Sequence, residues 1–313
     1  MKRVLSIDGG GIKGVFPASF LTTLEESLGA NPAEFFDLIV GTSTGGIIAL
    51  GLGLGLSARD ILTFYEQHGP VIFAGNRFVR FLRHIGLSKY SSAPLRTALE
   101  SVFGDRTLGE SSKRLVIPSA NLDTGEVHIW KTAHHIRFER DYRARVVDVA
   151  LATSAAPTYF PTHRCAAGSP LIDGGVWANN PIGVAAVEAR GVLGWPADCV
   201  RILSLGCTET PIDVRWGQWY PLGWAYWGTK MADVFMRAQS SGSLGTAQHL
   251  VADRNNVVRI NPVVSGRFGL DTLREIDSLR GLGASEARNA LPSLRQLFFD
   301  APAEAFVPFH SPL

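Results

Sequence analysis

Ser43 lies at the centre of the pentapeptide Gly-Thr-Ser-Thr-Gly at residues 41–45. A short run rich in branched apolar residues precedes it at 36–40, and a longer apolar segment follows it. This order predicts a strand, a tight turn and a helix, with the serine at the apex of the turn. There its hydroxyl would face the positive end of the helix, which suits a nucleophile whose attack creates an oxyanion. Taken alone, the pentapeptide also fits a glycine-rich turn that only caps a helix.

A carboxylate is the second group that could do chemistry. Asp173 follows the apolar pair at 171–172 and precedes Gly174 and Gly175, an order typical of a strand end. Such a carboxylate could accept the proton of the serine directly, without a histidine, provided that burial raised its pKa. For this residue taken alone, a turn in which Asp173 caps its own backbone is the alternative.

The third candidate is the glycine loop Asp-Gly-Gly-Gly-Ile-Lys-Gly at residues 8–14, which follows an apolar strand and precedes a segment with helical spacing. Successive glycines allow backbone N–H groups to converge on one anion, as the oxyanion hole of an acyl-transfer enzyme requires. The same glycines fit a dinucleotide-binding fingerprint, so a nucleotide-dependent oxidoreductase is an alternative. That fingerprint expects an acidic residue at the end of the second strand, whereas Asp37 precedes that strand.

Two consecutive units of strand, loop and helix must position these groups, and they predict an α/β fold with a mostly parallel central sheet. The first unit covers residues 4–28 and the second carries Ser43. Further strands are expected at 114–120, 127–130 and 200–206, and further helices at 58–73, 95–102, 146–154 and 181–190. No linker divides the chain, so we expect a single domain over residues 1–313, with a core at about 3–210 and a C-terminal helical, lid-like region at about 211–313.

Composition narrows the classes of function. Hydrophobic residues make up 46% and charged residues 19% of the chain, which is typical of a globular protein. The net charge of +2 is too small to indicate a nucleic-acid polymer as partner. The three cysteines form no C-x-x-C pair, which fits a reducing cytoplasm and argues against a disulfide framework or a zinc site. The longest nearly uncharged apolar run, residues 45–56, is too short to span a bilayer.

The three motifs at 8–14, 41–45 and 173–175, in this order and spacing, resemble those of the patatin-like phospholipases. The segments at 68–73, 89–99, 153–161 and 203–207 are similar to family segments as well. The resemblance implies a three-layer α/β/α fold and a lipid acyl hydrolase with a Ser–Asp dyad, in which Ser43 is the nucleophile and Asp173 the general base. It implies no metal and no cofactor. The remaining implied positions are the oxyanion-hole amides of Gly9, Gly10 and Gly11 and the supporting residues Lys13, Gly14, Gly41, Gly45, Gly174 and Gly175.

The implied activity is phospholipase A-type cleavage of membrane glycerophospholipids through an acyl-enzyme. Compact chains of this family resemble the effectors of bacterial anti-phage signalling, which are activated by a cyclic oligonucleotide, act in the cytoplasm and bind peripherally to the inner membrane. An unregulated lipid esterase would carry the same catalytic residues. A binding protein that keeps the fold without the chemistry is a further alternative. The sequence leaves open whether the chain forms a homo-oligomer.

Two further segments suggest contact with lipid or phosphate. Residues 216–227 contain six large aromatic side chains, which fit either a loop folded over the core or a lid that enters a membrane interface. A basic face is predicted around the apolar residues of 78–85, and it fits either a solvated helix or a surface for anionic lipid or a phosphate-bearing activator. The basic residues are Arg77, Arg80, Arg83, His84 and Lys89.

Overall fold

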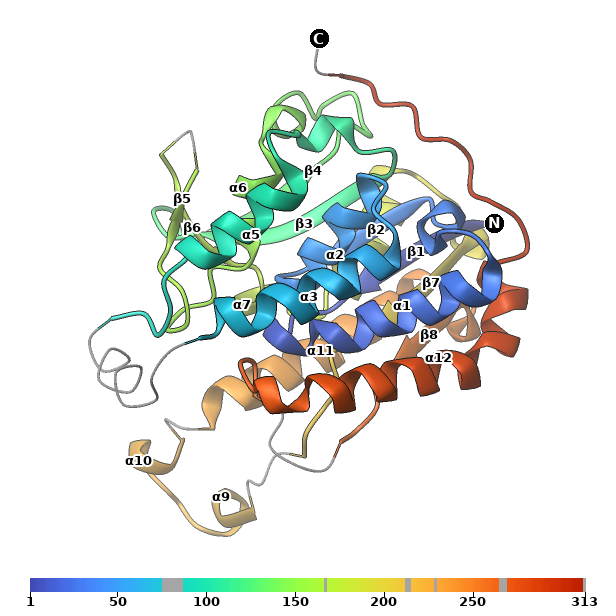
Figure 1. Ribbon diagram of the computed structural model, residues 1–313. Coiled ribbons are helices and arrows are strands. Elements are labelled where there is room, and N and C mark those ends of the chain that lie inside the picture. The colour runs from blue at the N-terminus through green and yellow to red at the C-terminus, as the bar shows by residue number, and fades with distance from the viewer. Residues whose placement is uncertain (75–86, 166–167, 212–214, 228–229, 265–268, 312–313) are drawn as a thin grey trace.

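The computed structural model describes residues 1–74, 87–165, 168–211, 215–227, 230–264 and 269–311. Within them, eight strands form one sheet in the spatial order β5-β6-β3-β2-β1-β7-β8, with β4 also paired to β3 (Figure 1). The strands are β1 (Lys2–Ile7), β2 (Leu38–Gly41), β3 (Arg114–Asn121), β4 (Val127–Lys131), β5 (His163–Arg164), β6 (Pro170–Asp173), β7 (Val200–Leu205) and β8 (Val257–Ile260).

The centre of the sheet is parallel, which confirms the predicted fold class. β1 lies between β2 and β7 and runs parallel to both, and β3 and β8 extend the parallel part on either side. β4, β5 and β6 join β3 by antiparallel pairing. Because helices cover both faces, the central strands are near-continuous apolar runs rather than alternating ones.

Helices cover both faces of the sheet, which gives the three-layer α/β/α arrangement (Figure 1). The core therefore has two parts, one on each face, and alternate side chains of β1 point into one or the other. Leu5 and Ile7 pack with α1, α2, α3, α5, α6 and α12, whereas Val4 packs with α8 and α11. The helices are α1 (Val15–Leu28), α2 (Thr44–Gly53), α3 (Ala58–Ile72), α5 (Ala93–Phe103), α6 (Val146–Thr153), α7 (Gly175–Ala178), α8 (Ile182–Val187), α9 (Arg215–Trp219), α10 (Trp224–Trp227), α11 (Met231–Leu250) and α12 (Ile276–Phe298).

One edge of β3 is shared by two strands. Ser119 pairs with both a β4 and a β6 residue, so β4 and β6 lie on opposite edges of β3. Val116 pairs with both a β2 and a β4 residue, so β2 also lies opposite β4. β2 and β6 therefore occupy the same edge, β2 along its beginning and β6 along its end. Since β6 is antiparallel to β3 and β2 is parallel to it, the carboxyl ends of β2 and β6 point toward each other.

The C-terminal region contains the expected helices, α11 and α12, and also adds strand β8 beside β7. In Figure 1, α12 runs beside α1 on one face of the sheet. Its end is held by four phenylalanines, with ring centroids 5.3 Å apart for Phe35 and Phe299 and 6.1 Å apart for Phe36 and Phe298. The last part of the chain thus packs into the same core as the first strands.

The two segments singled out for lipid contact are described to different extents. Of the basic residues, only Lys89 is described, and its Nζ lies 2.5 Å from Asp271 Oδ2, while residues 77–84 lie outside the described part of the chain. In the aromatic segment, Trp216 is 64% and Trp219 79% exposed, so these two rings are not folded over the core. No helix in the described ranges is both long and apolar enough to cross a membrane.

Phe298→Ala tests how firmly α12 is joined to the core. The ring is fully buried, so we expect its loss to lower the free energy of unfolding by about 3–5 kcal/mol, through lost burial and the cavity left behind. Urea unfolding followed by tryptophan fluorescence measures the change. Phe309→Ala is the matched control, because that ring is 60% exposed, and we expect it to cost less than about 1 kcal/mol. Equal effects would contradict the described packing of α12.

Candidate active site

Ser43 stands on a strained elbow between β2 and α2. Its φ of 55° and ψ of −121° lie in a region that residues other than glycine rarely adopt. The close approach of neighbouring backbone requires glycine on both sides. A Cβ on Gly41 would lie 2.1 Å from the Gly45 carbonyl oxygen, and one on Gly45 would lie 2.2 Å from the Ile7 carbonyl oxygen. The order of strand, turn and helix is thus as predicted.

Thr153, at the end of α6, links the elbow to β3. Its hydroxyl accepts a hydrogen bond from the Ser43 backbone N–H at 3.0 Å and donates one to the Pro118 carbonyl at 2.6 Å. On the other side of the turn, the Thr42 hydroxyl donates to the Ala178 carbonyl at 2.6 Å. The sequence pointed to the segment at 153–161 only through its resemblance to a family segment. The role of the threonine becomes visible only once α6 and the elbow are seen together.

Asp173 ends β6 and is 5% exposed. Its Oδ1 accepts a hydrogen bond from the Gly175 backbone N–H at 2.6 Å. Burial raises the pKa of Asp173 to about 6, and the opposing contributions of the Ser43 hydroxyl and the Gly175 amide do not cancel that rise. A carboxyl with this pKa is ionised at neutral pH yet basic enough to accept a proton.

Ser43 and Asp173 open onto one cavity of about 540 Å³. Gly10 and Gly11 of the glycine loop line the same cavity. Most of its remaining wall is apolar and aromatic, which suits a hydrocarbon chain. These wall residues include Ile47, Phe64, Ile72, Phe73, Leu95, Tyr159, Phe160, Val176, Phe235 and Met236.

The three predicted oxyanion-hole amides are not equivalent. The Gly9 N–H donates to the Asn179 carbonyl at 2.9 Å and is therefore engaged within the protein. For the Gly10 and Gly11 N–H groups, the described residues offer no backbone acceptor. Gly9 also has no room for a side chain, because a Cβ there would lie 2.5 Å from Asn179 Oδ1 and 3.3 Å from Ser43 Cβ.

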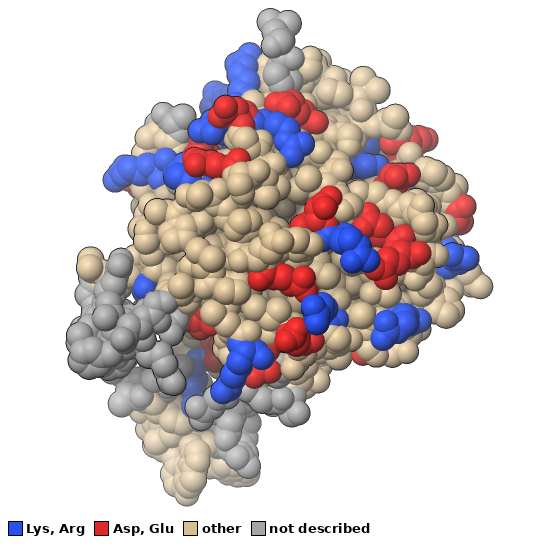
Figure 2. Space-filling model, viewed as in Figure 1, with Lys and Arg blue, Asp and Glu red and all other residues tan. Residues whose placement is uncertain are grey.

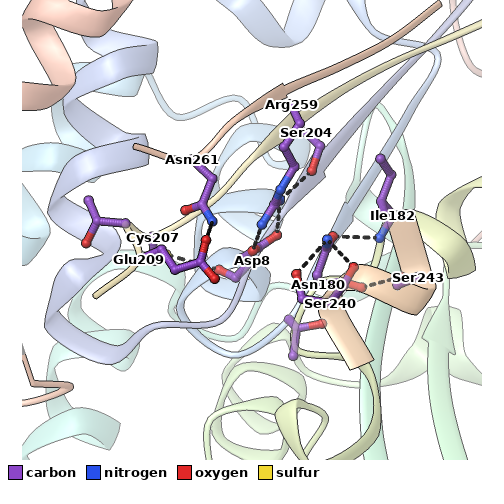
Figure 3. Close-up of polar contacts among 12 residues, drawn as sticks. Asp8, Asn180, Ile182, Ser204, Cys207, Glu209, Ser240, Ser243, Arg259 and Asn261 are labelled. Atoms are coloured by element: carbon purple, nitrogen blue, oxygen red, sulfur yellow. Dashed lines mark hydrogen bonds and ion pairs between the residues drawn. The ribbon is translucent and has the colours of Figure 1, made fainter. Parts of the chain in front are cut away.

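Contacts from the far end of the chain hold the glycine loop. Arg259 on β8 reaches Asp8 with two hydrogen bonds, of 2.8 and 2.5 Å, and also donates to Ser204 Oγ at 2.7 Å (Figure 3). The Leu270 carbonyl accepts a hydrogen bond from the Ile12 N–H at 2.8 Å, where Gly11 has a φ of 58°. These supports were not identified from the sequence, because nothing near Asp8 in the chain indicates them.

The other predicted motif residues surround the elbow. Gly14 ends the short helical turn Gly11–Gly14 of the glycine loop, and a Cβ there would lie 2.2 Å from Thr44 Oγ1. Gly174 lies against the Pro118 carbonyl, and Gly175 begins α7. The Lys13 side chain is directed away from the cavity and donates to the Thr208 carbonyl at 3.2 Å, and burial lowers the pKa of Lys13. The structure thus brings together three motifs that are far apart in the sequence.

Comparison with known proteins agrees with this fold and this arrangement of motifs. A family model described as patatin-like phospholipase matches residues 5–186, and the chain belongs to that family. A cGAMP-activated phospholipase of Pseudomonas aeruginosa is 34% identical over 99% of this chain and 95% of its own length. One of the same description from Vibrio cholerae is 39% identical over 65% of this chain and 63% of its own length. Patatin-like protein 2 of Oryza sativa subsp. indica is 34% identical over 66% of this chain and 61% of its own length.

Asp173→Asn tests the cost of burying the carboxylate. Because the pKa of Asp173 is about 6 in the folded protein and about 4 in the unfolded chain, wild type loses stability from this group as pH rises between those values. Above pH 6 the free energy of unfolding is lower by about 3 kcal/mol because of this group, and an asparagine, which does not ionise, causes no such decrease. We therefore expect the stability advantage of Asp173→Asn in urea unfolding to grow between pH 4.5 and pH 7.5. Asp123→Asn, in the exposed β3–β4 turn, is the control, and a pH-independent difference for Asp173→Asn would contradict a buried carboxylate.

Proposed function

We propose that the protein is a phospholipid acyl hydrolase in which Ser43 is the nucleophile and Asp173 the general base. The observation that carries the proposal is a strained serine and a buried carboxylate of raised pKa on the wall of one apolar cavity. Membership in the patatin-like phospholipase family supports the same activity. The described residues lining this cavity include no histidine and two carboxylates, Asp173 and Asp233. Asp173 is the one suited to take the serine proton, because the Ser43 hydroxyl hydrogen-bonds to it.

The geometry suits acyl transfer in two steps. Ser43 Oγ attacks the ester carbonyl carbon while Asp173 accepts its proton, and the oxyanion takes hydrogen bonds from the Gly10 and Gly11 amides. Collapse breaks the ester bond, and Asp173 returns the proton to the departing alcohol, which leaves as a lysophospholipid. A water molecule then attacks the acyl-enzyme with Asp173 again as base, and this step releases the fatty acid and restores Ser43.

In this scheme, Gly9 supports the loop and does not donate to the oxyanion. Its amide is engaged by the Asn179 carbonyl, which fixes the loop at its first glycine. The same contacts weaken the oxidoreductase alternative. The Leu270 carbonyl lies against Gly11, where a dinucleotide-binding loop would leave room for a pyrophosphate.

We also propose that the enzyme meets its substrate at the surface of a membrane, on the cytoplasmic face of the inner membrane. Phe235 on α11 lines the acyl cavity and is 63% exposed, so the apolar wall continues to the outside of the protein. The lobe that bears α9 and α10 adds exposed Trp216 and Trp219, and much of it is tan in Figure 2, the colour of residues other than Lys, Arg, Asp and Glu. Aromatic rings of this kind favour the headgroup region of a bilayer.

Activation by a cyclic oligonucleotide is part of the proposal. Two relatives described as cGAMP-activated phospholipases support it, one of them matched over 99% of this chain. The alternative of an unregulated lipid esterase differs in one observable respect, since such an enzyme would release fatty acid at the same rate with and without cGAMP.

Ser43→Ala and Asp173→Asn test the dyad. We expect each to lower fatty-acid release from phosphatidylethanolamine–phosphatidylglycerol vesicles, assayed with cGAMP present, by at least about a thousandfold, because nucleophile and base act as a unit. Ser278→Ala on the exposed face of α12 is the matched control and should retain wild-type activity. Retention of activity by either dyad variant would exclude this mechanism.

The pH dependence tests the role of Asp173 separately. A protonated carboxyl cannot accept the serine proton, so kcat/KM on a soluble short-chain ester should rise with pH, pass its midpoint near the Asp173 pKa of about 6, and level off above it. Circular dichroism at each pH would separate this titration from unfolding. A profile that is already flat at pH 5 would show that another group acts as base.

A further inference from the structure

A second cavity lies behind the glycine loop. Its volume is about 910 Å³, and its lining is mainly polar, whereas that of the acyl cavity is mainly apolar. The two cavities share part of a wall, formed by Asn179, Asp233, Met236 and Leu270. The catalytic scheme above assigns no task to this second cavity.

Four cationic side chains line the second cavity, against three carboxylates. Arg259 is paired with Asp8, and Arg237 Nε lies 3.5 Å from Glu209 Oε1. The other two cations, Lys13 and Lys230, have no carboxylate within ion-pair distance among the described residues, and Asp233 is the third acidic side chain in the lining. Lys13 Nζ donates to the Thr208 carbonyl, and Lys230 Nζ lies 5.6 Å from the centre of the Tyr226 ring. Two ammonium groups are therefore available to an anionic ligand.

The wall also contains buried polar atoms without partners. The Thr208 hydroxyl has no hydrogen-bond partner in the described structure, although the residue is only 6% exposed and has a φ of 66°. Asn261 Oδ1 is likewise buried and unpartnered, while its Nδ2 lies 3.5 Å from Glu209 Oε2 (Figure 3). Buried polar atoms are nearly always hydrogen-bonded in folded proteins. The Thr208 hydroxyl can donate to a ligand oxygen, and the Asn261 oxygen can accept from a ligand O–H or N–H. Together with the two ammonium groups, these atoms suit a ligand that carries both phosphates and hydrogen-bond donors.

We propose that this second cavity binds a phosphodiester, and that its occupant is a cyclic dinucleotide. Lys13 and Lys230 would pair with the phosphates, and Thr208 and Asn261 would hydrogen-bond the sugars or bases. The cavity lies at the upper end of the range of about 300–1,000 Å³ that small-molecule sites occupy, which favours a dinucleotide over a lipid headgroup of the same phosphodiester chemistry. The assignment rests on the proposed activation by a cyclic oligonucleotide and gives it a site.

The position of the second cavity provides a route to the active site. Lys13 belongs to the same short helical turn as Gly11, Gly11–Gly14, so a ligand that pairs with Lys13 acts on the loop that holds the oxyanion. Leu270 lines both cavities, and its carbonyl fixes the Ile12 N–H. A ligand that changes these contacts would alter the position of the Gly10 and Gly11 amides. Couplings between two sites typically amount to about 5- to 150-fold.

Binding is tested with the full-length Ser43→Ala protein and fluorescently labelled cGAMP, so that no lipid cleavage is needed for the readout. We expect Lys230→Glu and Lys13→Gln to weaken binding by about tenfold or more, since each removes an ammonium group that pairs with a phosphate. Arg288→Glu, on the exposed face of α12, changes the net charge as Lys230→Glu does and should bind within about twofold of the parent protein. Unchanged binding by both cavity variants, or no binding of cGAMP by the parent, would overturn the proposal.

Competition distinguishes the two sources of a phosphodiester. Unlabelled cGAMP should displace the probe, whereas glycerophosphoglycerol and inorganic phosphate at the same concentration should not. Displacement by glycerophosphoglycerol as effective as by cGAMP would instead make the cavity a headgroup subsite. Fatty-acid release by wild type is measured in parallel. If cGAMP binds and the cavity variants weaken its binding, but wild type releases no fatty acid, only the proposed hydrolase activity is refuted. If wild type releases fatty acid but cGAMP does not bind, only this inference is refuted.

Discussion

The active site depends on one edge of β3, along which β2 and β6 meet from opposite directions. β2 delivers Ser43 from one side and β6 delivers Asp173 from the other, while Thr153 bridges the β3 carbonyl of Pro118 to the serine amide. A shift of one residue in the pairing of β6 would turn the Asp173 side chain to the other face of the sheet. The relative position of Ser43 and Asp173 therefore depends on strand register and not on a local loop.

Both reactive groups are held in states that the free chain would avoid. Backbone strain of the Ser43 kind typically costs about 1–3 kcal/mol, and burial of Asp173 opposes its ionisation. The surrounding structure sustains these costs because the sheet is covered on both faces and its apolar positions are fully buried. The segment at 216–227 differs from this buried core, because it keeps Trp216 and Trp219 exposed.

The features that were predictable from the sequence are those encoded locally. The elbow around Ser43, the strand end at Asp173 and the parallel sheet follow from short patterns of apolar residues and glycines. The resemblance to a family then indicated that the three motifs form one site. Engagement of the Gly9 amide by Asn179 was not predictable, because it depends on where a distant turn comes to lie. Strand β8 was missed as well, since its four residues are too few to produce a clear period. The role of the segment at 216–227 was not predictable from the sequence, because aromatic residues suit a core and a membrane interface equally.

The residues that hold the glycine loop come late in the chain, and this affects when the loop can form during synthesis. Asp8 and Arg259 are separated by 251 positions, and Leu270 lies further still along the chain. Because synthesis proceeds from the N-terminus, Ser43 and Asp173 leave the ribosome well before Arg259 and Leu270, which hold the glycine loop. A nascent chain thus carries Ser43 and Asp173 before the contacts that hold the glycine loop can form. The glycine loop can therefore take its final position only after Arg259 and Leu270 have been synthesised.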